Sequence, residues 1–112
     1  ANFVQCDAET YPKAYEILKE HIVYLHIKDA LHSDHSVVPS GMGDGKVKEI
    51  LNSLKDSGFK GFLSLEPHLG KFTGFQDLEL DSDTRNMPDG GPKQFAVACE
   101  ALKRILAEIG GV

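Results

Sequence analysis

The chain of 112 residues is 41% hydrophobic, which suits one soluble domain with its own core and leaves little length for a second. Its 17 acidic and 12 basic residues give a formal net charge of −5, which disfavours a nucleic-acid partner because phosphate contacts depend on clustered Lys and Arg. No apolar run reaches the roughly 20 residues of a membrane-spanning helix, and residues 1–7 do not resemble a signal peptide. We therefore expect a cytoplasmic protein with no membrane partner, whose widely separated Cys6 and Cys99 are reduced thiols.

The first part of the chain predicts a helix, a strand and a loop. A helix is expected over residues 11–21, with Pro12 at its first position and an apolar face. Residues 22–27 are rich in β-branched and aromatic side chains and apolar at both alternating positions, as in a buried parallel strand. A polar loop follows over residues 28–40.

A second helix and a second strand follow the glycine-rich residues 41–45. Apolar side chains recur at helical spacing from Val47 to Leu54, with Asp44 as the expected N-cap and Gly58 as the stop. Residues 61–67 repeat the strand pattern and end at Pro67, which cannot donate to a sheet.

The remainder predicts a long loop and a final helix. Residues 68–91 have no sustained period and contain several Gly and Pro residues, so we expect a loop. The last helix is expected to open near Pro92 and to end at residues 110–111. Its apolar stripe is predicted to consist of Phe95, Ala98, Leu102, Ile105, Leu106 and Ile109.

The order helix, strand, helix, strand, helix predicts an α/β fold with two parallel strands joined by a right-handed crossover. Two such strands leave unpaired edges, which parallel sheets normally cover. We therefore expect that further strands precede residue 1 in the natural protein, or that copies of the chain associate to complete the sheet.

Two residues at the expected strand ends have side chains suited to chemistry. His26 lies near the carboxyl end of the first strand, and Glu66 lies at the corresponding end of the second. Active sites of parallel α/β folds collect at that edge, where an imidazole and a carboxylate can share one divalent ion. The alternative is a hydrogen-bonded core histidine and a carboxylate that faces a loop.

Three motifs occur in a single order and together cover most of the chain: His26-Ile27-Lys28-Asp29, Gly41-Met42-Gly43-Asp44-Gly45 and Leu63-Ser64-Leu65-Glu66-Pro67-His68. This series resembles the closing third of the sugar phosphate isomerase/epimerase family, the xylose-isomerase-like barrels. The resemblance implies that residues 1–112 form the last three strand-helix units of a TIM (β/α)8 barrel, with the sixth strand largely missing. It places His26 on the seventh strand and Glu66 on the eighth.

The resemblance also implies a metal-dependent sugar or sugar phosphate isomerase or epimerase. His26 and Glu66 match two of four ligands for a divalent ion such as Mn²⁺, Zn²⁺, Mg²⁺ or Co²⁺, and Glu66 also matches one of two carboxylates that move a proton between carbon atoms. The aspartate and the second glutamate of the family pattern are absent from this sequence. The chain is therefore expected to be a C-terminal fragment that is inactive alone and associates with the rest of a barrel or with itself.

Four further residues are expected to line the same opening and to orient sugar hydroxyls: Lys28, Asp29, His32 and His68. Charged loop residues are more often simply solvated, and that remains the alternative for all four. The glycine loop favours a tight turn into the following helix over a phosphate site, because Asp44 at its centre repels an anion unless it caps the helix.

Two other functions compete with the isomerase. One is a non-catalytic α/β module that assembles through its unpaired strand edges. The other is an abasic-site endonuclease of the same fold family, which ranks lower because residues 32–37, His-Ser-Asp-His-Ser-Val, have the required residue types in the wrong arrangement. The acidic net charge of −5 also disfavours that activity.

Overall fold

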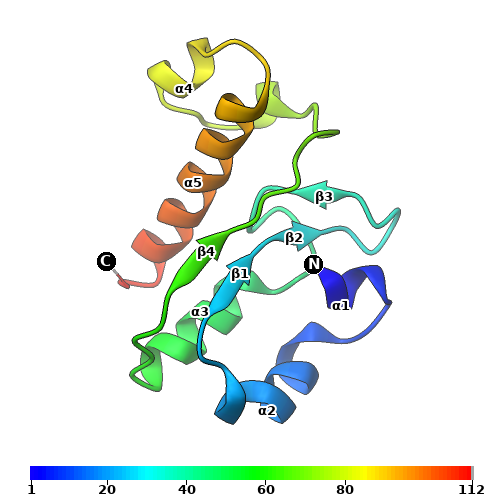
Figure 1. Ribbon diagram of the computed structural model, residues 1–112, viewed down its shortest axis with the longest axis vertical. Helices are drawn as coiled ribbons and strands as arrows, with labels where there is room; N and C mark the ends of the chain where they lie inside the picture. The colour runs from blue at the N-terminus through cyan, green and yellow to red at the C-terminus, as the bar shows by residue number, and fades with distance from the viewer. Residues whose placement is uncertain (112) are drawn as a thin grey trace.

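Two short parallel strands lie at the middle of the fold in the computed structural model, which describes residues 1–111 (Figure 1). Strand β1 (Leu25–Ile27) pairs with β4 (Leu63–Leu65), with Leu25 opposite Leu63 and Ile27 opposite Leu65. A separate antiparallel pair is formed by β2 (Asp29–Ala30) and β3 (Val37–Val38). The chain is thus a small mixed α/β fold, and its described residues close no barrel.

Helices cover one face of the parallel pair. The main core consists of Ile27 together with side chains from α3 (Val47–Asp56) and α5 (Gly91–Glu108), and Leu25, Leu63 and Leu65 pack against it. Side chains alternate along a strand, so the residues between these leucines and isoleucines point to the other face. That face is open: His26 and Ser64 are exposed, and Phe62, just before β4, is 83% exposed.

The prediction that both faces of the first strand are buried is therefore wrong. The regular strand also begins only at Leu25, and the preceding Val23 and Tyr24 are 75% and 53% exposed. The sequence pattern of residues 22–27 is that of a strand between two packed layers, but the described residues supply a layer on one side only. The parallel pairing itself is confirmed, as is the end of the second strand before Pro67.

The N-terminal segment does not form the single helix expected over residues 11–21. It consists of α1 (Asn2–Gln5), an irregular helical turn η1 (Thr10–Ala14), α2 (Tyr15–Leu18) and a 3-10 turn η2 (Lys19–His21). Tyr11 is extended, with φ −140° and ψ 133°. A residue before proline is pushed out of the helical region by the ring of that proline, so Pro12 delays the regular helix to Tyr15.

The segment between β4 and α5 is more ordered than the predicted loop. It contains a 3-10 turn η3 (Phe75–Asp77) and a short helix α4 (Ser82–Asn86), whose first turn is capped by the Asp81 carboxylate accepting from the Thr84 N–H at 2.8 Å. A second core cluster lies beneath this segment and consists of Leu69, Leu80, Val97 and Ala98. Helix α5 begins at Gly91 with Pro92 in its first turn, as expected, but Phe95 of the predicted stripe is 52% exposed.

Asp29 organises the glycine-rich loop that leads into α3. Its side chain is 1% exposed, and its oxygens accept backbone N–H groups of four residues: Ala30, Gly41, Gly43 and Gly45. Asp44 is not the N-cap of α3, which was the expectation. Its carboxylate instead accepts the His32 N–H at 2.8 Å, and the residue before α3 is Lys46 in a left-handed conformation with φ 56°. Gly58, with φ 79°, follows the end of α3 as expected.

The close approach of this loop to Asp29 requires glycine at position 43. A Cβ atom at Gly43 would lie 2.7 Å from the Asp29 Cγ, whereas a Cβ at Gly70 would meet no atom within 4 Å. We expect Gly43→Ala to lower the free energy of unfolding by about 1–3 kcal/mol, and Gly70→Ala to change it by less than about 0.5 kcal/mol. Urea denaturation of both variants measures the difference, and equal effects would contradict the packing described for the loop.

None of the helices formed by residues 1–111 is long and apolar enough to cross a membrane.

Candidate functional site

His26 and Glu66 meet at the carboxyl ends of the two parallel strands. His26 is the middle residue of β1, opposite Ser64, and Glu66 directly follows β4. The Glu66 backbone N–H donates to the Ile27 carbonyl at 3.2 Å, which extends the register of the pair beyond β4. The two side chains lie on the open face, where the His26 Nδ1 is 3.0 Å from the Glu66 Oε2. The contact on which the predicted site depends is therefore present.

Two more of the predicted site residues surround the same carboxylate. The Lys28 Nζ lies 3.8 Å from the Glu66 Oε2, and the His68 Nε2 lies 3.2 Å from the Glu66 Oε1. The hydrogen bond from His26 lowers the pKa of Glu66, and the positive charge of Lys28 lowers it further. Glu66 is thus held as an anion that faces one lysine and two imidazoles.

A cavity of about 330 Å³ opens beside this cluster along the outer edge of β1. His26, Lys28 and Glu66 supply charged or titratable side chains to its wall. The rest is mostly apolar and comes from α1, η1, α2 and α3, with Phe3, Tyr15, Leu18, Ile50 and Leu51 among the lining residues. Binding pockets of small molecules commonly combine apolar walls with a few convergent polar groups, so this cavity is the candidate site.

The other two predicted substrate-binding residues lie differently. Asp29 is buried, and both of its oxygens accept backbone N–H groups of the glycine loop, so its carboxylate is not available to a sugar. The prediction for Asp29 is corrected accordingly: its role is to hold that loop. His32 is exposed, and within residues 1–111 no hydrogen bond or ion pair joins its ring to Glu66.

Two residues of the site were missed from the sequence. The Tyr24 ring lies 5.4 Å from the His26 ring, on the same open face, and lines the cavity. The alternation of the strand was the available signal, because Tyr24 is two residues before His26. Thr10 also lines the cavity, and its hydroxyl oxygen is buried without a hydrogen-bond partner in the described part of the chain. No sequence pattern indicated Thr10, since it reaches the site only through the irregular turn η1.

The residues present do not make up a complete metal centre. An imidazole nitrogen and a carboxylate oxygen are donor types that suit a divalent ion such as Zn²⁺ or Mn²⁺. However, the part of the chain described by the structure contains no group of three or more His, Cys, Asp and Glu side chains placed to hold one. His26 and Glu66 supply at most part of a ligand set, and the described residues do not define how a metal would act.

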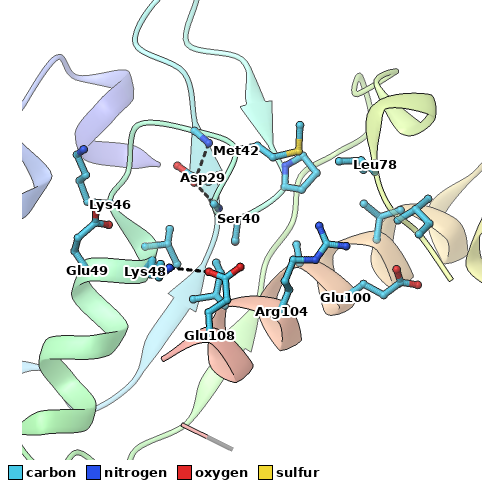
Figure 2. A pocket seen from close by; sticks show the side chains of 18 residues that line it. Asp29, Ser40, Met42, Lys46, Lys48, Glu49, Leu78, Glu100, Arg104 and Glu108 are labelled. Atoms are coloured by element: carbon cyan, nitrogen blue, oxygen red, sulfur yellow. Dashed lines mark hydrogen bonds and ion pairs between the residues drawn. The ribbon is translucent and has the colours of Figure 1, made fainter. Parts of the chain in front are cut away.

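A second cavity, of about 290 Å³, lies between the glycine loop, the start of α3 and α5 (Figure 2). Its charged lining includes three cations and four carboxylates: Lys46, Lys48, Arg104, Asp29, Glu49, Glu100 and Glu108. The Lys48 Nζ pairs with the Glu108 Oε2 at 2.8 Å, and Arg104 donates to the Glu79 carbonyl at 2.7 Å. One ion pair thus joins two of these charged side chains, and neither His26 nor Glu66 lines this cavity.

Comparison with protein-family models gives no match for this chain, and comparisons with curated proteins and with solved structures give none either.

Proposed function

We propose that this chain forms part of a metal-dependent isomerase or epimerase acting on a sugar or sugar phosphate, and that it supplies closing units of a TIM barrel. The observation that carries the proposal is the contact between His26 and Glu66 at the carboxyl ends of adjacent parallel strands. In barrel enzymes this is the edge at which catalytic residues gather. The open face of the β1–β4 pair supports the proposal, because strand residues on the inner side of a barrel face other strands and not helices.

We assign Glu66 the role of proton acceptor for a carbon next to a carbonyl group. Its carboxylate lines the cavity, is 39% exposed and is ionised, although the hydrogen bond from His26 and the charge of Lys28 lower its pKa and so make it a weaker base. Lys28 is close enough to stabilise negative charge that develops on a substrate oxygen. Such a reaction also uses a second carboxylate and further metal ligands. We assign these groups to strands outside the described residues.

A titration with Mn²⁺ tests the proposal without a known substrate. The wild-type melting temperature is expected to rise, while that of the His26→Ala, Glu66→Ala double variant stays unchanged. A ligand at ten times its dissociation constant stabilises a protein by about 1.4 kcal/mol, which corresponds to a shift of about 5 °C for a domain of this size.

The chain offers a matched control for this titration. Asp7 and His35 form a histidine-carboxylate contact that does not involve Glu66, at 2.9 Å and also exposed, but away from the parallel strands. The Asp7→Ala, His35→Ala double variant should keep the full response to Mn²⁺. If the wild type does not respond, or if the Asp7 and His35 pair accounts for the response, then His26 and Glu66 form no part of a metal site and the proposal loses its main support.

A non-catalytic assembly module is the second candidate, and one observation favours it. Within residues 1–111, β1 and β4 have no strand neighbours apart from each other, and unpaired edges are templates for association with another chain. The same titration separates the two candidates. An assembly module whose His26 and Glu66 have no chemical role predicts identical Mn²⁺ responses for the wild type and the double variant.

A further inference from the structure

A cavity of about 720 Å³ lies away from Glu66, between the segment that follows β4 and the beginning of α5. Figure 1 shows this segment, with α4, lying against the N-terminal half of α5. Two aromatic rings, Phe72 and Phe75, form part of the wall and contact each other edge to face at 5.3 Å. Two cations, Arg85 and Lys93, line the same cavity. None of these residues takes part in the site at His26 and Glu66.

Lys93 is the unusual member of this group. It is only 9% exposed, and lysine is rarely buried to this extent unless a counter-charge accompanies it. The Lys93 Nζ lies 5.0 Å from the centre of the Phe75 ring and 3.1 Å from the Asp89 Oδ1. The Asp89 side chain is 84% exposed. The cation is therefore inside the protein, whereas its counter-ion lies at the surface.

Arg85 adds a second positive charge, and within residues 1–111 it forms no ion pair. Its Nη2 donates to the Leu80 carbonyl at 2.8 Å, which uses one of the five donors of the guanidinium group and holds its position. Asp89 is the only carboxylate among the residues that line this cavity, so two cations face one anion. The cavity in Figure 2 differs in this respect, because its carboxylates outnumber its cations.

We propose that this cavity binds a phosphate monoester with a small aromatic or apolar body. The phosphate takes the place of Asp89 at Lys93 and also accepts from Arg85, whose planar donor fork matches phosphate geometry. The body of the ligand packs against Phe72 and Phe75. A phosphate group fits better than a carboxylate, because its second negative charge matches the second cation. The proposal does not depend on the function assigned to Glu66.

Calorimetric titration of the intact chain with phenyl phosphate tests the site. Arg85→Gln is expected to weaken binding at least tenfold, because it removes one of the two cations. Asp89→Asn is expected to tighten binding severalfold, because it removes the carboxylate that competes for Lys93. Asp83→Asn, which removes an exposed carboxylate from α4 that does not line the cavity, is the matched control and should leave the affinity unchanged. Lys93→Met should abolish binding, but that variant also removes a buried cation and its contact with Phe75, so the surface substitutions carry the conclusion.

Several results would overturn the proposal. Phenyl phosphate failing to bind at millimolar concentration would exclude the site, and binding that Arg85→Gln leaves intact would place the ligand elsewhere. Equal affinities of the Asp89→Asn and Asp83→Asn variants would show that Asp89 does not occupy the anion position. Inorganic phosphate serves as the second ligand: if it binds as tightly as phenyl phosphate, then Phe72 and Phe75 do not recognise an organic body and the assigned ligand class is wrong.

Discussion

Replacing Asp29 with alanine is expected to lower the free energy of unfolding by about 3–5 kcal/mol. The carboxylate is almost fully buried and accepts four backbone N–H groups. Three of those donors, Gly41, Gly43 and Gly45, belong to the loop that precedes α3. Without the carboxylate, the buried donors of Ala30 and Gly45 lose their acceptor, and the cost of leaving them unpaired is added to the loss of the partly buried bonds from Gly41 and Gly43.

Asp34→Ala is the control for this substitution. The Asp34 carboxylate also accepts hydrogen bonds, from the backbone N–H and hydroxyl of Ser36, but the residue is exposed and water can replace it. We expect Asp34→Ala to cost less than about 1 kcal/mol. Urea unfolding followed by circular dichroism measures both variants. A loss below about 1 kcal/mol for Asp29→Ala as well would show that the loop is held by other contacts.

The second large effect is expected on the covered face of the parallel strands. Ile27→Ala should lower the free energy of unfolding by about 2–5 kcal/mol, because Ile27 is 3% exposed in the core formed with α3 and α5. Phe62→Ala removes a larger side chain from the opposite face, where Phe62 is 83% exposed, and should change stability by less than about 0.5 kcal/mol. Ile27 lies in β1 and Phe62 directly precedes its partner β4, and the two side chains lie on faces with different surroundings.

This pair of variants tests the openness of the face that carries His26 and Glu66. Chemical denaturation at low protein concentration, where any association is weakest, gives both values. A loss of several kcal/mol for Phe62→Ala would mean that another layer covers the open face. The cluster at Glu66 would then be an internal contact, and the proposal of an opening lined by it would fail.

The local pattern of the sequence was sufficient for the elements that depend on short-range rules. The second strand ends before Pro67 and α5 begins with Pro92 in its first turn, because proline lacks the donor that a sheet or a helix interior needs. The contact of His26 with Glu66 was also predictable, since the carboxyl ends of two parallel strands lie at the same edge of the sheet. The places of Lys28 and His68 near Glu66 follow from the same register.

Only the tertiary structure decided which polar residues became structural and which face of the strands remained open. The sequence places Asp29 beside Lys28 in a polar stretch, and nothing local indicates that glycine amides 12 to 16 residues away converge on its carboxylate. Phe62 and Val23 have the apolar character of core residues but are exposed, because burial depends on which surfaces the rest of the fold brings against a strand. Periodicity reflects neighbours in the chain, whereas the contacts of Asp29 and Glu66 are made with residues distant in sequence and form only when the chain folds. The exposure of Phe62 is likewise set by the tertiary structure.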